Sequence, residues 1–228
     1  MRIVSLVPSL TETLTAWDRV PIACTRFCER PDLEHVGGTK NPDVSRIEAL
    51  RPDLIVMDAE ENRREDYDAL LDRDLRVCVV HIRSLVDVNP SMEELALSVG
   101  ATWRSVEFGQ PLPTRLRAFI PIWRHPWMAL GTPTYGSSLL QQLGVENVNE
   151  ADGAYPQVEL DDARSRYPDV VLAPSEPYPF SDRQLPELGL VAPTYFVDGK
   201  DLFWWGHRTH DALVRLAATI DAICTAST

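Results

Sequence analysis

The chain has 228 residues, of which 44% are hydrophobic and 25% charged, so it can bury a globular core as one large domain or as two small lobes. Its formal net charge of -12 gives a surface that repels phosphate backbones and anionic lipids, which argues against nucleic acid and bare membrane as partners. No apolar run approaches the roughly 20 residues of a membrane helix, so we expect no membrane insertion.

The N-terminal residues MRIVSLVPSL begin directly with a strand-like run and lack the basic, apolar and small-residue regions of an export signal. As written, the chain is therefore predicted to be cytoplasmic, and periplasmic or surface-anchored if a leader has been removed. The cysteines form no paired CxxC set, which fits a reducing compartment without a zinc knuckle. They are Cys24, Cys28, Cys78 and Cys224.

Short apolar runs alternate with helical patterns in the first half of the chain. The run RIVSLV, residues 2–7, precedes a capping box in which Ser9 and Glu12 bond each other's backbone amides, so a strand should feed a helix. Continuous apolar runs of strand length follow at residues 20–24, 54–57 and 76–80. Such runs are expected of parallel strands covered on both faces, which predicts an α/β unit.

The second half repeats this pattern. Pro52-Asp53 and Pro168-Asp169 each follow a helical pattern and precede an apolar run, at a separation of 116 residues. The apolar run at 194–198 corresponds to the run at 76–80, at nearly the same separation along the chain. We infer two similar Rossmann-like α/β lobes, although one shared unit of this kind also arises by chance.

A helix is predicted between the lobes, over residues 91–109. It opens with a capping box, Ser91 to Glu94, and its apolar face is formed by Leu95, Val99, Trp103 and Val106. Prolines at 111 and 113 must end it. The predicted organisation is an N-terminal lobe over 1–89, a connecting helical segment over 90–120 and a C-terminal lobe over 121–228, a clamshell with a cleft between its lobes.

Parallel sheets bind ligands beside the carboxyl ends of their strands, so the loops that follow the strands carry the candidate site. These loops are rich in aromatic residues, which are costly on a surface unless something covers them. Loop positions supply Ser9, Phe27, Cys28, Lys40, Glu60, Trp123, Trp127, Glu176, Tyr178, Trp204, Trp205, His207 and Arg208 as candidate ligand-binding residues.

Several runs, in order along nearly the whole chain, resemble the helical-backbone (class III) substrate-binding proteins of ABC transporters. They are RIVSLVPSLTE, TRFCERP, VGGTKNPDVSRIEALRPDLIV, IWRHPWM with GTPTYGSSLL, SEPYPF, and VDGKDLFWWGHR. The cobalamin-binding and iron-chelate-binding members are the most similar. The resemblance implies that a corrinoid, haem or ferric siderophore is held between two lobes without chemical transformation, with no cofactor required and with an ABC permease as partner if the protein is exported.

The resemblance also assigns residues. Aromatic positions of the cobalamin binder correspond here to Phe27 with Cys28 and to Trp204 with Trp205. The family's IWxxPWM and TY patterns add Trp123, Trp127 and Tyr135, which fit internal packing equally well. The chain departs from the family in lacking an export signal and in having a short, Pro-interrupted connection.

Other functions stay open on the residues alone. Cys28 could ligate a metal or act as the nucleophile of a hydrolase with His207 as its base, although Cys24 and Cys28 more often are buried thiols. His207 with His210 forms an HxxH lacking a third ligand, so no metal site is predicted. Lys40 and Arg208 would favour carboxylate or phosphate groups on a ligand. Since no catalytic constellation has supporting spacing, we predict a binding protein, with a protein-interaction module as another alternative.

Overall fold

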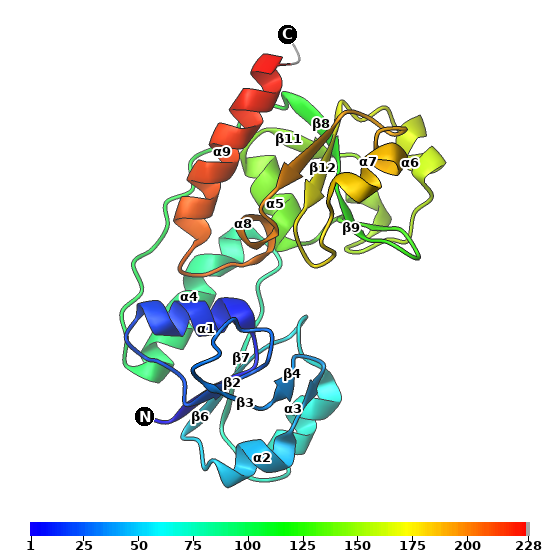
Figure 1. Cartoon of the computed structure of the whole chain (residues 1–228). Coiled ribbons are helices and arrows are strands. Elements are labelled where there is room, and N and C mark those ends of the chain that lie inside the picture. The colour runs from blue at the N-terminus through cyan, green and yellow to red at the C-terminus, as the bar shows by residue number, and fades with distance from the viewer. Residues whose placement is uncertain (227–228) are drawn as a thin grey trace. The chain divides into compact units, whose positions relative to one another are not determined.

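The computed structural model describes residues 1–226, and its contacts divide the chain into two compact units. Unit 1 comprises Met1–Ile82 with Val86–Ser105, and unit 2 comprises Arg83–Leu85 with the chain from Val106 onward. The predicted connecting segment is thus shared between the units. Figure 1 labels the elements of both, and each unit is described by itself.

Unit 1 is built on a parallel five-stranded sheet with the strand order β3-β2-β1-β6-β7. A two-stranded antiparallel hairpin, β4-β5, lies outside this sheet. The strands are β1 (Ile3–Ser5), β2 (Ala23–Cys24), β3 (Glu34–His35), β4 (Gly37–Gly38), β5 (Asn41–Pro42), β6 (Leu54–Asp58) and β7 (Val77–Val80). The helices are α1 (Pro8–Ala16), α2 (Val44–Ala49), α3 (Arg64–Leu71) and α4 (Leu85–Val99).

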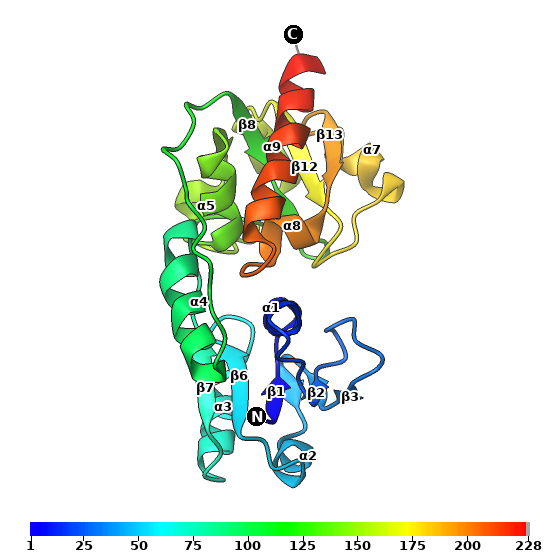
Figure 2. The ribbon, with the colours of Figure 1, turned by 90° about the vertical axis from the view of Figure 1, so that its left-hand side faces the viewer.

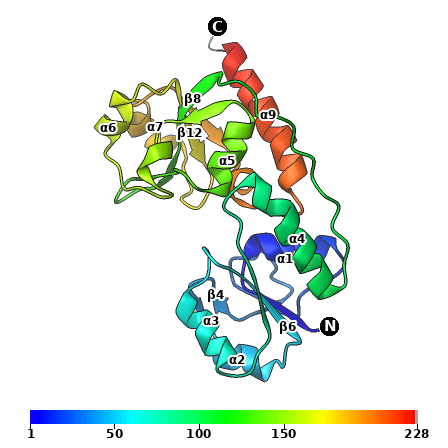
Figure 3. The same ribbon diagram turned by 180° about the vertical axis from the view of Figure 1, so that it is seen from behind.

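Helices cover both faces of this sheet, with α1 and α4 on one side and α2 and α3 on the other (Figures 1 and 3). All five residues of β6 are buried, as the continuous apolar run predicts. On the α2 and α3 side, Ile47 and Leu70 pack against Val4, Ile55 and Met57 of the strands. This cluster excludes water and fixes the strand ends that carry the loops of unit 1.

Unit 2 is built on a parallel four-stranded sheet with the order β11-β8-β12-β13, and β9 and β10 form a separate antiparallel pair. The strands are β8 (Leu116–Phe119), β9 (Pro121–Trp123), β10 (Met128–Ala129), β11 (Val145–Asn147), β12 (Val170–Pro174) and β13 (Thr194–Val197). The helices are α5 (Tyr135–Gln142), α6 (Leu160–Ser165), α7 (Leu185–Leu188), α8 (Gly199–Phe203) and α9 (Thr209–Ala226), with 3-10 turns η1 (Glu150–Asp152) and η2 (Asp182–Gln184).

Helices also cover both faces of the second sheet: α5, α8 and α9 lie on one side, and α6 and α7 on the other (Figures 1 and 2). Ala163 of α6 and Leu188 of α7 pack with Phe119, Val171 and Ala173 of the strands. Both predicted lobes are therefore present as α/β units with parallel sheets, and the predicted fold class is confirmed.

The Pro-Asp repeat has the same structural role in both units. The Asp53 carboxylate accepts a hydrogen bond from the Arg2 amide at 2.5 Å, and the Asp53 amide donates to the Arg2 carbonyl at 2.8 Å. In unit 2 the same exchange joins Asp169 and Arg117, at 2.7 and 2.8 Å. Each aspartate thus joins the amino ends of two neighbouring strands, so the sequence repeat corresponds to the same pair of hydrogen bonds in both units.

Both predicted capping boxes are wrong, and so is the predicted extent of the helix over 91–109. Helix α1 begins at Pro8 with no side-chain cap, because proline has no amide hydrogen to satisfy and its fixed φ suits the first helical position. Helix α4 begins at Leu85, six residues before Ser91, and contains Pro90. Its buried stripe of residues 85, 88, 92, 95 and 99 follows helical spacing and so tolerates the one lost hydrogen bond.

Helix α4 ends at Val99 because Gly100 follows it with φ of +64°, a conformation that glycine adopts at low cost. The Ala101 amide donates to the Ala96 carbonyl at 2.8 Å, and the Gly100 amide to the Leu97 carbonyl at 3.3 Å, which is a Schellman motif. Trp103 and Val106 therefore lie beyond the helix. Among residues 1–226, no helix is long and apolar enough to cross a membrane.

Candidate functional site

Three loops of unit 1 are joined through Asn62, a buried residue of the loop after the strand at 54–57 that is not among the predicted ligand-binding residues. Its side-chain amide donates to the carbonyls of Leu6 at 3.3 Å, after β1, and of Thr39 at 2.8 Å, in the β4-β5 hairpin. Its amide oxygen accepts from the Asp58 amide at the end of β6, at 2.9 Å. The carboxyl ends of β1 and β6 and the hairpin thus form one assembled surface.

Phe27 lies on this surface and is 51% exposed. The Arg26 guanidinium lies 4.8 Å from the centroid of its ring, and the Arg26 amide donates to the Gly37 carbonyl of the hairpin at 2.9 Å. A Cβ on Gly38 would lie 3.1 Å from the Phe27 ring, so a side chain at this position would displace the ring by a few tenths of an ångström. The structure therefore presents an accessible aromatic ring beside a cation.

Lys40, Glu60 and Ser9 complete the predicted residues of unit 1. The Lys40 ammonium donates to the Glu60 carbonyl at 2.6 Å, so the hairpin tip contacts the loop after β6. Ser9 is buried in the first turn of α1, at 4% exposure. The structure brings Phe27, Lys40 and Glu60 to the same group of loops.

Cys28 is almost completely buried, at 5% exposure. Its sulfur lies 3.2 Å from the Thr11 hydroxyl, which donates to it, and 3.2 Å from the Thr25 hydroxyl. None of these partners is a general base, so the contacts of Cys28 do not supply the activated nucleophile that a hydrolase requires.

Asp58 is a buried carboxylate at the end of β6, with 2% exposure. Its Oδ1 accepts from the amides of Glu60 and Glu61, each at 2.9 Å, and burial raises the pKa of Asp58 to about 7. It lines a cavity of about 460 Å³ together with Asn62 and Tyr67. The sequence places Asn62 among the residues that follow the strand at 54–57, but it does not indicate Asp58, because a polar residue at the end of a strand gives no signal of its burial.

A row of aromatic rings marks the β9 end of unit 2. Trp123 is 44% exposed and meets Tyr178 edge-on at 5.8 Å between centroids. Tyr178 lies 4.7 Å from Phe180, which stacks on Trp127 at 6.0 Å. Since Trp127 and Tyr178 pack against the hydrophobic core, Trp123 is the accessible end of this row.

Trp204 lies directly after α8 and is half-buried. Two cations lie against its ring, the Lys200 ammonium at 5.1 Å and the Arg208 guanidinium at 5.3 Å from the centroid. His207, two residues before α9, is exposed. Aromatic and cationic groups thus occur together here, as they do at Phe27.

Arg208 is held by Asp201, a carboxylate with 3% exposure, at 2.9 Å. Arg215 binds both oxygens of the same carboxylate, each at 2.7 Å. This buried carboxylate fixes the position of Arg208 beside Trp204.

Two predicted aromatic residues lie inside unit 2. Trp205 is 5% exposed and Tyr135 is 4% exposed. The Tyr135 hydroxyl donates to the Thr209 hydroxyl at 3.2 Å, and burial raises the pKa of Tyr135. Both side chains therefore contribute to the packing of the unit, which is the alternative that the TY pattern left open for Tyr135.

Glu176 follows β12 and approaches the start of α8 closely. A Cβ on Gly199 would lie 2.5 Å from the Glu176 side chain and backbone nitrogen, so glycine is required for this approach. The Gly199 amide also donates to the Ser175 hydroxyl at 2.9 Å. The loop after β12 and the segment leading to Trp204 are thereby joined.

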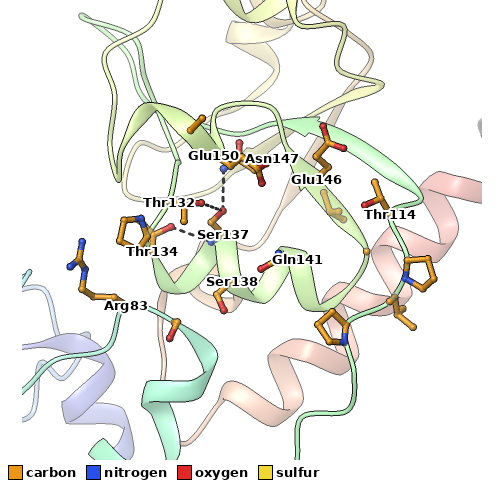
Figure 4. A pocket seen from close by; sticks show the side chains of 18 residues that line it. Arg83, Thr114, Thr132, Thr134, Ser137, Ser138, Gln141, Glu146, Asn147 and Glu150 are labelled. Carbon is orange, nitrogen blue, oxygen red and sulfur yellow. Dashed lines mark hydrogen bonds between the residues drawn. The ribbon is translucent and has the colours of Figure 1, made fainter.

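A larger cavity of about 730 Å³ lies beside α5 and is lined by none of the predicted residues (Figure 4). Hydroxyl groups of Thr132, Thr134, Ser137 and Ser138 line it. Ser137 bonds Thr132 at 3.2 Å and Asn147 at 3.3 Å, and its amide donates to Thr134. These polar groups satisfy one another, so the cavity gives no indication of a particular ligand. Within residues 1–226, no group of three His, Cys, Asp or Glu side chains is placed to hold a metal.

Two α/β units, each with a parallel sheet and with polar and aromatic loops after its strands, place the chain in the fold class of the two-lobed periplasmic binding proteins. A solved vitamin B12-binding protein of Vibrio cholerae superposes with a TM-score of 0.77 at 19% identity, over 98% of this chain and 97% of that one. A periplasmic haem-binding protein in complex with two haems gives 0.77 at 18% identity, over 98% of each chain.

Curated relatives agree with these structures. A vitamin B12-binding protein of Pectobacterium carotovorum is 24% identical over 204 residues, covering 77% of this chain and 72% of the relative. One of Salmonella choleraesuis is 21% identical over 189 residues, covering 75% and 71%. No family model matches the chain. These relatives are named for binding rather than catalysis, and they confirm the resemblance to substrate-binding proteins.

Proposed function

We propose that the chain binds a large, partly aromatic metal chelate, such as a corrinoid, haem or ferric siderophore, without chemically transforming it. One observation carries the proposal: each unit presents an accessible aromatic ring together with a cation in a loop beyond its strands. In unit 1 these are Phe27 and Arg26, and in unit 2 they are Trp204 with Lys200 and Arg208.

Aromatic rings and cations together suit this class of ligand. A flat conjugated macrocycle or catecholate offers faces and edges to aromatic side chains, and each such contact contributes about 0.5–1.5 kcal/mol beyond its buried area. Carboxylate or phosphate groups at the ligand's edge would bind Lys40, Lys200 or Arg208. The names of the relatives, which bind vitamin B12 or haem, support the same class.

The proposed contact residues are those that the structure leaves accessible near these rings: Phe27, Lys40, Glu60, Trp123, Glu176, Tyr178, Trp204, His207 and Arg208. Ser9, Cys28, Trp127, Tyr135 and Trp205 are proposed to support these positions from within each unit.

The test is titration of purified protein with cyanocobalamin, haemin and a ferric catecholate, followed by absorption and calorimetry. Phe27→Ala and Trp204→Ala should each weaken binding of the preferred ligand roughly two- to tenfold, which corresponds to about 0.5–1.5 kcal/mol. Tyr167→Ala is the matched control, because Tyr167 is 80% exposed but precedes β12, at the opposite ends of the strands. Failure of all three ligands to bind at micromolar protein, or equal losses in the control, would refute the proposal.

Location and partner follow as further proposals. We propose two alternatives: export with an ABC permease as partner, or cytoplasmic capture and delivery of the ligand. Fractionation of the host cells with an antibody against the protein distinguishes the two locations.

A further inference from the structure

Strand β7 forms one edge of the sheet in unit 1, and its outer side is unpaired. The strand order places β6 on one side of β7 and no strand on the other. The Ile55 amide of β6 donates to the Arg76 carbonyl at 2.9 Å, so the even-numbered residues of β7 face β6. By alternation, the amide and carbonyl groups of Val77 and Val79 face outward, where they have no partner among residues 1–226.

The β7 edge lacks the features that usually protect an edge strand. Soluble proteins place charged side chains, prolines or bulges there, because an open edge can pair with another strand. Strand β7 has the sequence Val-Cys-Val-Val and pairs with β6 in continuous register. Val79 is 42% exposed, and Val77 and Cys78 are half-buried. An uncharged, apolar strand edge is therefore accessible to a further strand.

A second copy of β7 fits this edge in one symmetric register. The outward groups belong to Val77 and Val79, on either side of Cys78. Two antiparallel copies related by a two-fold axis therefore place Val77 opposite the partner's Val79, and each such pair exchanges two hydrogen bonds. Four hydrogen bonds then satisfy the outward groups of both strands. Cys78 lies on the axis, opposite the partner's Cys78.

The charges beside the strand suit the same register. Arg76 lies on the same face of the sheet as Cys78, and a cavity of about 150 Å³ on this face is lined by Cys78, Val80 and Glu94, among others. In the symmetric register Arg76 lies opposite the partner's Val80, and so beside the partner's Glu94. In the part of the chain that the structure describes, neither the Arg76 nor the Glu94 side chain forms an ion pair or hydrogen bond. The dimer gives each of them a partner of opposite charge.

We propose that the β7 edge is a homodimer interface, through which two copies of the chain join their five-stranded sheets in antiparallel orientation. The occupant is a second copy rather than an unrelated strand, because self-pairing satisfies every outward group of β7 and brings opposite charges together. The contact is small, so the dimer is weak and its population depends on protein concentration. This inference rests on unit 1 alone and is independent of the proposed ligand.

Cys78 provides a direct assay of the register. The Cα atoms of facing residues that are not hydrogen-bonded to each other lie about 4.5 Å apart, within the range that a disulfide spans. Diamide, which takes one electron and one proton from each thiol, is added to the full chain carrying Cys224→Ser, because Cys224 is the other cysteine that is not buried. Trypsin then releases Cys78 in the peptide 77–83.

We expect two copies of this peptide joined by a disulfide that dithiothreitol cleaves, in a yield that rises with protein concentration. Sedimentation of the unoxidised wild type should show a dimer over the same concentrations. A peptide recovered only as the monomer at every concentration, or a protein that sediments as a monomer throughout, would overturn the proposal.

A matched pair of substitutions distinguishes the two outer strands. Phe196 is the third residue of β13, which is an edge strand of unit 2, and it is 42% exposed, as Val79 is in β7. Val79→Lys places a charge in the interface and should lower the yield of the Cys78 disulfide about tenfold. Phe196→Lys should leave that yield unchanged. If only Phe196→Lys abolishes the dimer, the interface lies at β13 and the proposal is wrong.

Charge reversal tests the interface without changing the strand's apolar residues. Arg76→Glu should weaken the dimer, because it meets the partner's Glu94 with a like charge, and the double variant Arg76→Glu with Glu94→Arg should restore it. Both side chains are exposed, so these variants serve even where Val79→Lys alters the circular dichroism and is set aside. A double variant that dimerises no better than Arg76→Glu alone would show that the symmetric register is wrong.

Discussion

Replacing Asp58 by asparagine should make the protein's stability less sensitive to pH. Asp58 is 2% exposed, and its Oδ2 has no hydrogen-bond partner within residues 1–226. Burial favours the protonated carboxyl and raises its pKa from an ordinary 3.8 to about 7 in the folded protein. The folded state therefore binds more protons than the unfolded state between these pH values, and stability falls as the pH rises through that interval.

The size of the effect follows from the two pKa values. A difference of about three units corresponds to about 4 kcal/mol of folding free energy, which is retained below about pH 4 and lost by about pH 7. Asparagine carries no charge, and its oxygen can still accept the amide hydrogen bonds of Glu60 and Glu61 that Asp58 accepts. Asp58→Asn should thus match the wild type near pH 4 and exceed it by up to about 4 kcal/mol at pH 8.

Urea denaturation of both proteins from pH 4 to 8 measures this difference directly. Subtracting one curve from the other removes the contribution of every other titrating group. A constant difference across the range, or a difference that shrinks as the pH rises, would show that burial does not raise the pKa of Asp58 in the folded protein.

Two pairs of substitutions test unit 2. Trp205→Ala should lower the free energy of unfolding by roughly 3–5 kcal/mol, because Trp205 is 5% exposed. Trp204→Ala should lower it by about 1 kcal/mol, through the loss of its cation contacts, and equal losses in thermal denaturation would contradict this contrast. Asp201→Ala should lower the free energy of unfolding, measured in urea, by about 3 kcal/mol, because it removes the buried carboxylate that binds Arg208. Arg215→Ala should lower it by less than about 1 kcal/mol, because the Arg215 side chain is half-exposed. A larger loss for Arg215→Ala than for Asp201→Ala would contradict this prediction.

Apolar runs predicted the positions of the strands well. All residues of β6 are buried, as expected of a strand covered on both faces, whereas the edge strand β7 is apolar although Val79 is 42% exposed. The run at 54–57 became Leu54–Asp58, and the run at 76–80 became Val77–Val80. The run at 20–24 yielded only Ala23–Cys24, since strand length also depends on a partner, and β3 has two residues. Pairing partners are set in three dimensions and cannot be counted along one run.

Helix boundaries were predicted less well than helix existence. The capping pattern at Ser91 predicts a helix start six residues after the apolar stripe begins at Leu85, and Gly100, with φ of +64°, is the residue that ends the helix. The aromatic residues show a related difficulty: Trp204 and Trp205 are neighbours in sequence, yet one is half-buried and the other 5% exposed. Composition identified the aromatic loops, but only packing separates the two rings.

The matching roles of Asp53 and Asp169 suggest a common origin for the two units. Matching details extend beyond them: the Arg2 side chain bonds the Leu50 carbonyl at 2.7 Å and the Arg117 side chain bonds the Arg166 carbonyl at 2.9 Å; the two carbonyls are 116 residues apart and the two arginines 115. Such agreement is expected if one ancestral half was duplicated. The amino ends of the strands share one construction in the two units, whereas the loops at the opposite ends differ: Phe27 and Cys28 lie there in unit 1, and Trp204 and Trp205 in unit 2.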